Sequence, residues 1–261
     1  MSSLKQLTLL VKDAVTNRDP HEKFLHELDE TMSIIDRREQ RVPSTTYKPS
    51  SLGGCKRNMY FQVIGANLDE AKKSGAGIIG ICETGSARHE ILQNWVCRMK
   101  ECGYNCEWID VETFLKSRQV AGTIVKEKSG METKCYNEIL NISFLCDGII
   151  KYDDQYYILE IKTEDNFKHQ KRVSAEKKHI AQATAYSVCL GIDQVIFLYE
   201  NRNYCTRKSF LVNITDEMKQ ELVIDEIEEI ENYRAKNEVP PKSTVKSDCT
   251  YCNYKTECKK W

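Results

Sequence analysis

The sequence predicts an α/β fold in which helices flank a mixed sheet, and three observations support this class. Apolar residues recur at helical spacing near both ends of the chain. The middle instead contains short β-branched or aromatic segments separated by Gly, Asn or Asp, near residues 105–112, 119–126, 135–145, 146–152 and 155–162. A helix over 175–190 is followed by two more strands, at about 194–200 and 205–213. No GxGxxG motif follows a strand, which excludes a Rossmann fold.

The first 45 residues predict a helical appendage made of two amphipathic helices. The first helix covers residues 3–17, with apolar positions Leu4, Leu7, Leu10, Val11 and Val15. Asp19-Pro20 is typical of a helix cap and first turn, and the apolar pattern continues at Phe24, Leu25, Leu28, Met32 and Ile35. We expect residues 46–261 to form one large domain.

Loops and helices then alternate on either side of the strands. Residues 41–54 are expected to form a loop, a short helix to follow Cys55, and residues 74–80 to be a Gly-rich connection. Residues 85–100 predict a helix whose buried face carries Ile91, Leu92, Trp95, Val96 and Met99. Near the C-terminus, Thr215 is expected to cap a long acidic helix that ends at Pro240-Pro241, before a cysteine-rich tail.

The composition limits the class of protein. The 261 residues carry 38 Lys+Arg against 39 Asp+Glu, and this net charge of −1 excludes a uniformly basic nucleic-acid binder. It leaves room for a basic groove, because phosphate binding depends on local charge. No apolar run approaches the roughly 18 residues that span a bilayer. The N-terminus lacks the basic-then-apolar layout of a secretory signal, so we expect a cytoplasmic protein without a membrane partner.

The twelve cysteines fall into two groups. In a reducing compartment they are expected to be free thiols or metal ligands. Eight are scattered singly and are expected to be buried as small apolar side chains: Cys82, Cys97, Cys102, Cys106, Cys135, Cys146, Cys189 and Cys205. The other four are Cys55 and the crowded trio Cys249, Cys252 and Cys258. Four thiolates suit either zinc or a [4Fe–4S] cluster, and one remote cysteine plus three is the less usual arrangement for zinc.

The most informative stretch for chemistry contains Asp147, Glu160 and Lys162. Asp147 begins one apolar strand, and Glu160 and Lys162 end the next, on one face of it. If the two strands form a hairpin, Asp147 lies beside Glu160, and a divalent cation such as Mg²⁺ or Mn²⁺ would relieve the repulsion between the carboxylates. A lysine beside that cation can hold an attacking water. The alternative is a solvated strand edge, which is common in a chain with 30% charged residues.

Three other groups of residues add weight to a site. His89 lies near the start of a helix, although a lone helical histidine is more often structural. Gln182 and Tyr186 lie one helical turn apart, where they could contact a phosphate or nucleobase or simply pack together. A basic segment around Lys168, Lys171 and Arg172, extended by Lys177 and Lys178, has a local charge of +4 after Glu176 is counted. It could hold a phosphate backbone, or be a solvated loop.

Taken together, these residues resemble the PD-(D/E)XK nuclease superfamily. The resemblance is to RecB-like exonucleases with an iron–sulfur staple, such as the nuclease of CRISPR spacer adaptation and AddB-type nuclease domains. It spans about Cys55 to Cys258 and implies a restriction-endonuclease-like core. His89, Asp147, Glu160 and the Ile161 carbonyl would then bind Mn²⁺ or Mg²⁺, and Lys162 would position the water. Gln182 and Tyr186 would hold DNA, and the four segregated cysteines would ligate a structural [4Fe–4S] cluster.

The function that this resemblance implies is a metal-dependent DNA exonuclease. It would hydrolyse phosphodiester bonds from single-stranded ends, in recombination, repair or phage DNA processing. One alternative is a DNA-binding or assembly subunit that works through a helicase, recombinase or integrase. Another is a zinc-stapled nucleic-acid-binding protein without hydrolytic activity.

Overall fold

The computed structural model describes residues 19–38, 42–69, 75–250 and 252–261. The helix predicted over residues 3–17 lies outside these ranges. The chain divides into two compact units: Met1–Arg41 with Glu70–Thr84, and Val42–Asp69 with Gly85–Trp261. Each unit is described by itself. No helix in the described ranges is long and apolar enough to cross a membrane.

The first unit contains α2 (Pro20–Arg38) and the first residues of α4 (Ala76–Cys97). Helix α2 begins where Asp19-Pro20 predicted, since the Asp19 carbonyl accepts the first helical hydrogen bond from Lys23 N–H. The Gly-rich connection predicted over residues 74–80 is wrong from Ala76 onward, because these residues already belong to α4. Glycine weakens a helix by only about 1 kcal/mol relative to alanine, so continuity with the rest of a long helix outweighs it.

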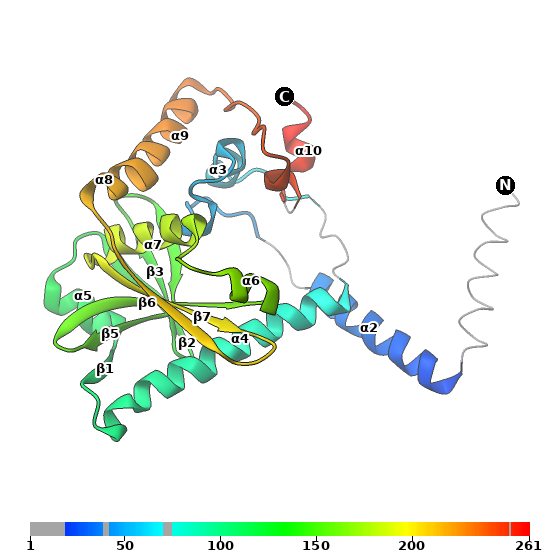
Figure 1. Ribbon diagram of the computed structural model, residues 1–261. Helices are drawn as coiled ribbons and strands as arrows, with labels where there is room; N and C mark the ends of the chain where they lie inside the picture. The colour runs from blue at the N-terminus through cyan, green and yellow to red at the C-terminus, as the bar shows by residue number, and fades with distance from the viewer. Residues whose placement is uncertain (1–18, 39–41, 70–74, 251) are drawn as a thin grey trace, which may run out of the picture. The chain divides into compact units, whose positions relative to one another are not determined.

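The second unit contains a mixed five-stranded sheet (Figure 1) with the strand order β1-β5-β6-β7-β8. Its strands are β1 (Cys106–Ile109), β5 (Gly148–Tyr152), β6 (Gln155–Glu164), β7 (Gln194–Asn201) and β8 (Arg207–Asn213). Strands β6 and β7 run parallel, and the other neighbours are antiparallel. The parallel pair is joined through α6 (Asn166–Lys171) and α7 (Lys177–Leu190). The predicted mixed α/β class is therefore confirmed.

A separate three-stranded antiparallel sheet has the order β2-β3-β4. It consists of β2 (Thr123–Ser129), β3 (Glu132–Asn137) and β4 (Ile142–Cys146). Sequence predicted one strand over 135–145, and this is wrong, because a turn with Asn141 at φ 52° folds that stretch into a hairpin. The strand predicted over 105–112 ends at Ile109, because Asp110 accepts the Thr113 N–H and caps α5 (Val111–Arg118).

Helices cover the core strands and hold the C-terminal tail. Helix α7 is rich in small residues, and Ala183, Ala185 and Cys189 are fully buried, so its backbone packs closely in the main core. The predicted acidic helix is present as α8 (Asp216–Lys219), a π-helical turn η3 (Gln220–Ile224) and α9 (Asp225–Lys236). It ends at Asn237, which adopts a left-handed conformation with φ 54°, before the two prolines.

The remaining helices are short. They are η1 (Pro49–Ser51), α3 (Lys56–Val63), η2 (Arg98–Cys102), η4 (Lys246–Cys249) and α10 (Lys255–Cys258). Helix α4 does not bury the face that periodicity predicted: Leu92 is buried, but Ile91 and Trp95 are 40% and 60% exposed. The buried face instead carries Gln93, whose amide reaches the backbone at Asp147. A polar anchor therefore replaces part of the expected apolar contact.

Candidate metal centre

Asp147 lies at the junction of the two sheets, between the last residue of β4 and the first of β5. Its side chain is nearly buried. The carboxylate oxygen Oδ2 accepts the Ile161 backbone N–H at 2.8 Å, and the Asp147 carbonyl accepts the Gln93 side-chain amide at 2.7 Å. These bonds fix the carboxylate at the start of β5, next to β6.

Glu160 lies beside Asp147 because β5 and β6 form the hairpin that the sequence predicted. Gly148 pairs with Leu159, so the next position along the register sets Asp147 opposite Glu160. Glu160 is 1% exposed. Its Oε1 lies 2.5 Å from the Lys162 ammonium, while its buried Oε2 has no hydrogen-bond partner within the described part of the chain.

The pKa of Glu160 reflects a site with two buried carboxylates and little positive charge around them. Burial and the Asp147 carboxylate raise the Glu160 pKa to about 8, and Lys162 only partly offsets this. Buried polar atoms in folded proteins normally have partners. An unpartnered carboxylate oxygen facing a second carboxylate is therefore a good fit to a hard divalent cation.

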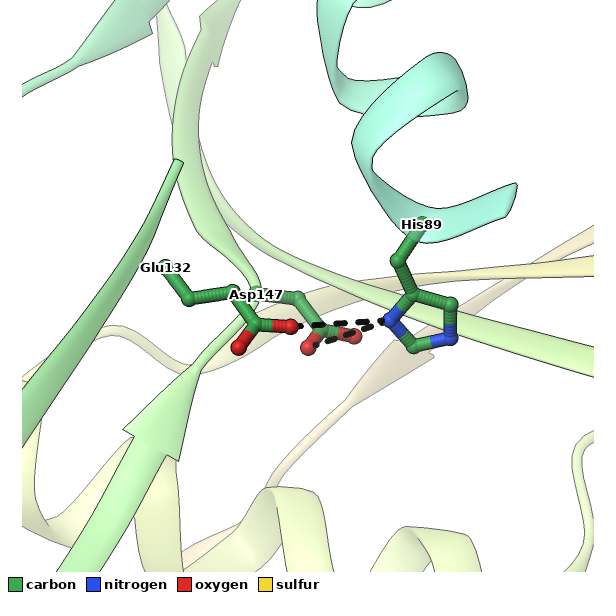
Figure 2. Close-up of side chains that lie close together, drawn as sticks. All are labelled: His89, Glu132 and Asp147. Atoms are coloured by element: carbon green, nitrogen blue, oxygen red, sulfur yellow. Dashed lines mark ion pairs between the residues drawn. The ribbon is translucent and has the colours of Figure 1, made fainter. Parts of the chain in front are cut away.

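His89 and Glu132 complete a cluster around Asp147 (Figure 2). The candidate ligand atoms of His89, Glu132 and Asp147 all lie within 4.8 Å of one another. His89 Nδ1 is 3.6 Å from Asp147 Oδ1 and 3.9 Å from Glu132 Oε1. Burial opposes protonation of His89, but its hydrogen bond to Asp147 and the Asp147 charge raise its pKa overall. Burial and the Asp147 charge raise the Glu132 pKa.

Glu132 is the residue of this cluster that sequence reasoning missed. It begins β3, and the pairing of Thr133 with Cys146 places Glu132 opposite Asp147 at the next register position. The signal in the sequence is the β3–β4 hairpin itself, which a single predicted strand over 135–145 concealed. Recognising the turn before Asn141 would have brought Glu132 next to the site.

Helix α4 is anchored so that His89 faces this cluster. The neighbouring Arg88 donates two hydrogen bonds to Glu200 of β7, at 2.6 and 2.9 Å, and Glu200 is fully buried. Gly85 sits so close to β6 that an added Cβ would lie 3.4 Å from Thr163 Oγ1. The Arg88–Glu200 ion pair and the approach of Gly85 to β6 together hold the turns of α4 that carry His89.

Lys162, Gln182 and Tyr186 form a hydrogen-bonded chain beside the two carboxylates. The Lys162 ammonium donates to Gln182 Oε1 at 3.2 Å, and the Gln182 amide donates to the Tyr186 hydroxyl at 2.6 Å. Burial opposes the charge on Lys162, but Glu160 and Asp147 raise its pKa overall, so the side chain is a cation. Tyr186 is largely buried, and its hydroxyl supports the Gln182 amide.

These residues line an open pocket of about 500 Å³ that adjoins the carboxylates. Its lining is Lys48, Pro49, Ser50, Lys134, Ser143, Phe144, Leu145, Asp147, Glu160, Lys162, Gln182 and Tyr186. The pocket therefore connects the candidate metal ligands to two lysines, Lys48 and Lys134, that sequence reasoning did not select.

The predicted basic segment is only partly available for binding. Lys168 and Lys171 are exposed on α6. Arg172 instead makes bonds of 2.7 to 2.9 Å to the buried Glu164 and lies 3.3 Å from Glu176. Its role as a DNA contact stays a prediction, but its guanidinium is already engaged within the fold.

The four segregated cysteines do come together in space. Cys55, Cys249, Cys252 and Cys258 all line one cavity of about 200 Å³. Cys252 Sγ accepts hydrogen bonds from the Asn58 amide at 3.3 Å and the Tyr254 N–H at 3.4 Å, and Cys258 Sγ accepts one from Arg57 at 3.5 Å.

The tail that carries three of these cysteines is fixed to the domain. Asp69 caps α10 by accepting the N–H groups of Lys255 and Thr256, at 2.8 and 2.9 Å. The prediction that the other eight cysteines are all buried is correct for Cys106, Cys135, Cys146 and Cys189, but Cys97 is half-buried and Cys82, Cys102 and Cys205 are exposed. Cys205 lies in the β7–β8 turn with φ 54°.

Comparison with known proteins gives neither a family nor a curated relative. No family model matches the chain, and no curated protein matches it. Among solved structures, that of SSO0001 is 13% identical with a TM-score of 0.46, over 90% of this chain and 96% of that one. An alkaline exonuclease from Laribacter hongkongensis is 16% identical with a TM-score of 0.35, over 80% of this chain and 97% of that one.

A structure of the Laribacter exonuclease in complex with dAMP has a TM-score of 0.34 and 16% identity, over 74% of this chain and 93% of that one. Similarities this weak do not identify a reaction. The chemistry of this chain therefore rests on its own residues.

Proposed function

We propose that this protein is a metal-dependent DNA nuclease that hydrolyses phosphodiester bonds from single-stranded ends. The observation that carries the proposal is the unpartnered, buried Oε2 of Glu160 beside Asp147. His89, Asp147, Glu160 and the Ile161 carbonyl would hold Mn²⁺ or Mg²⁺, and Glu132, which lies close to His89 and Asp147, would be a further oxygen ligand. The bound cation would supply Lewis-acid stabilisation of charge on the phosphate oxygens.

The residues around the cation would orient the attacking water and bind the DNA strand. Lys162 is a cation held between Glu160 and Gln182, so it donates hydrogen bonds and does not remove a proton. It would orient the attacking water and offset negative charge that develops on the phosphate. Gln182 would hold the strand through its amide, with Tyr186 as its hydrogen-bonded support. The exposed Lys168 and Lys171 would contribute long-range attraction for DNA.

We further propose that the four-cysteine cavity holds a structural [4Fe–4S] cluster. Four thiolates line a single cavity, backbone and side-chain donors reach two of the sulfurs, and Arg57, Lys242, Lys255 and Lys259 surround them. These cations would offset the negative charge of a thiolate-ligated cluster. Ligation would join α3 to the C-terminal tail. A zinc site is the alternative, and metal analysis separates the two.

The first test is nuclease activity with and without the cation. Anaerobically purified protein should degrade end-labelled single-stranded DNA with Mn²⁺, and EDTA should stop the reaction. Glu160→Gln should lower the rate by at least about 100-fold, because a ligand and the Lys162 contact are both altered. Glu228→Gln, which changes an exposed carboxylate on α9, is the matched control and should cleave normally.

Binding of the metal gives a readout that is independent of cleavage. Mn²⁺ should raise the melting temperature of the wild type and of Glu228→Gln, but much less that of Glu160→Gln. Equal stabilisation of all three proteins would place the metal elsewhere. A protein that binds Mn²⁺ and DNA without cutting any substrate would instead support the DNA-binding or assembly subunit of a helicase, recombinase or integrase complex.

The cluster has its own test. Purified protein should be brown, absorb near 400 nm and contain iron and sulfide. Cys258→Ala should lose this colour and melt at lower temperature, whereas Cys205→Ala, at an exposed turn, should keep both properties. A colourless protein that contains zinc would contradict the cluster while leaving the nuclease proposal intact.

A further inference from the structure

We propose that Lys48 and Lys134 form a phosphate-binding subsite in the pocket beside the metal centre. The subsite would take a phosphate of the bound strand other than the one being cleaved. This inference rests on the proposed nuclease function and deepens it, since it says how a single strand is positioned. Both lysines line the pocket that contains Asp147, Glu160 and Lys162.

The pleat of the three-stranded sheet places Lys134 on the same face as the metal ligands. Side chains alternate along a strand, so Glu132 and Lys134 of β3 project to one side. The burial pattern of β3 agrees with this. Thr133 and Cys135 are buried on the opposite face, whereas Glu132 is half-buried and Lys134 is exposed. Two residues of a strand extend about 7 Å, which is close to the length of one nucleotide in an extended chain. The Lys134 backbone therefore lies about 7 Å along β3 from that of Glu132.

The paired strand β4 continues this face. Lys134 pairs with Leu145, which is 42% exposed, and Ser143 pairs with Tyr136. Leu145 and Ser143 both line the pocket. The floor thus offers an apolar side chain suited to a sugar or base, and a hydroxyl suited to a phosphate oxygen.

Lys48 is held at the rim of the same pocket by backbone pairing. Its neighbour Tyr47 donates its N–H to the Asn141 carbonyl at 2.8 Å and accepts the Ser143 N–H at 2.9 Å. The Tyr47 hydroxyl also donates to Glu231 at 2.7 Å, and Pro49 is buried at the start of η1. The chain at Lys48 is therefore fixed along β4, and its long side chain is exposed beside the pocket.

The charges of the pocket favour an anion at these lysines. Across the described ranges, Lys48 has no ion pair within 4 Å, and Lys134 has one, with Glu127 at 3.9 Å on the exposed strand surface. The two acids of the pocket, Asp147 and Glu160, belong to the metal centre. Once a divalent cation neutralises them, Lys48 and Lys134, whose contact to Glu127 is long and exposed, leave a positive charge at the pocket. Arg172 differs, since Glu164 already satisfies it.

The size of the pocket is suited to a single nucleotide. A volume of about 500 Å³ lies in the range of pockets that enclose one small ligand. It suits one nucleotide with its phosphate. The phosphate could be an internal phosphodiester or a terminal phosphomonoester, which share the same donors but differ in charge.

The experiment measures binding of single-stranded DNA by the wild-type protein, the parent of the variants below, with Ca²⁺ in place of the catalytic cation. A fluorescent oligothymidylate is titrated in Ca²⁺ by anisotropy at several salt concentrations, in three forms: 5′-phosphorylated, 3′-phosphorylated and with hydroxyl ends. Lys48→Gln and Lys134→Gln are each added to the parent. Lys236→Gln, an exposed lysine at the end of α9, is the matched control.

Each pocket variant should weaken binding about tenfold and lower the slope of log affinity against log salt by about 0.7, the value for one contact to a single-strand phosphate. Lys236→Gln should do neither. A loss seen with all three oligonucleotides assigns the subsite to an internal phosphate. A loss confined to one phosphorylated form assigns it to that terminus.

Two outcomes would overturn the inference, and they differ from each other. If the wild type cleaves DNA but the lysine variants bind all three forms like the parent, with an unchanged salt slope, the subsite is wrong and the nuclease proposal stands. If the parent binds no oligonucleotide and the wild type cleaves none, the proposed function fails and the subsite fails with it. Melting curves that match the parent show that the lysine variants are folded.

Discussion

Arg172 offers a sharp test, because the sequence and the structure give it different roles. The sequence places it in a basic segment suited to DNA, next to Lys171. In the structure its guanidinium bonds both oxygens of Glu164, and its central carbon lies 4.1 Å from the centre of the Tyr199 ring. The side chains of Arg172 and Glu164 are only 12% and 6% exposed. We therefore predict that Arg172→Ala acts mainly on stability.

The magnitude follows from the carboxylate that is left behind. Removing one partner of a buried ion pair costs about 3–5 kcal/mol, because the other charge is stranded. The low end, about 3 kcal/mol, is appropriate here, since some water would reach Glu164 in the variant. For a domain of this size, each kcal/mol lowers the melting temperature by about 2–4 °C, so the expected fall is about 6–12 °C.

Lys171→Ala is the matched control, one residue away. The Lys171 ammonium lies 3.8 Å from the ring centre of Phe167, which is itself 66% exposed, so its loss should cost below about 1 kcal/mol. This variant should melt almost like the wild type but bind DNA with a shallower salt dependence.

The assay combines thermal melting with DNA binding measured well below the midpoint. Adding Glu164→Gln to Arg172→Ala should recover part of the lost stability, because a neutral amide is less costly to bury than an unpaired carboxylate. The reasoning is refuted if Arg172→Ala melts like the wild type and loses DNA binding. In that case the guanidinium would face the nucleic acid.

Two further predictions concern the neighbourhood of the site. A Cβ at Gly148 would overlap the Trp108 indole, so Gly148→Ala should destabilise the fold by about 1–3 kcal/mol and weaken Mn²⁺ binding at the adjacent Asp147. Gly80 has open space around it, so Gly80→Ala is the control and should have neither effect. Equal Mn²⁺ affinities of Gly148→Ala and the wild type, measured by calorimetry, would contradict this prediction. Burial and the nearby Lys162 lower the pKa of His179 to about 4. Because the unfolded chain then takes up the proton that the folded state excludes, stability should fall as the pH drops from about 6.5 to 4. His179→Gln should flatten that part of a urea-denaturation profile relative to wild type, and an unchanged slope would contradict the assignment.

The parts of the site that sequence reasoning located are those with local causes. Asp147 and Glu160 are thirteen residues apart on one hairpin, whose turn places Asp153 and Asp154 at φ 45° and 64°. Strand alternation and a tight turn are sufficient to set such carboxylates side by side. The tail cysteines were likewise visible as a dense group.

The parts that were missed depend on pairing between distant segments. Glu132 reaches Asp147 through the β3–β4 hairpin, which the prediction of a single strand over residues 135–145 missed, and Lys48 reaches the pocket because Tyr47 pairs beside β4. Charge patterns carry the same ambiguity: the sequence shows that Arg172 is basic but not that Glu164 is buried beneath it. Exposed apolar residues on α4, such as Trp95, show that periodicity predicts a helix more reliably than the face it buries.

The position of Asp147 shows why the candidate metal centre depends on the whole second unit. The residue before it ends the three-stranded sheet and the residue after it begins the five-stranded sheet. Its backbone is held by Gln93 from α4 and its carboxylate by the N–H of Ile161 from β6. The position of one carboxylate is therefore determined by two sheets and a helix at once. Because Glu132, Glu160 and His89 each come from a different one of these elements, the ligands approach one another only when all three have packed together.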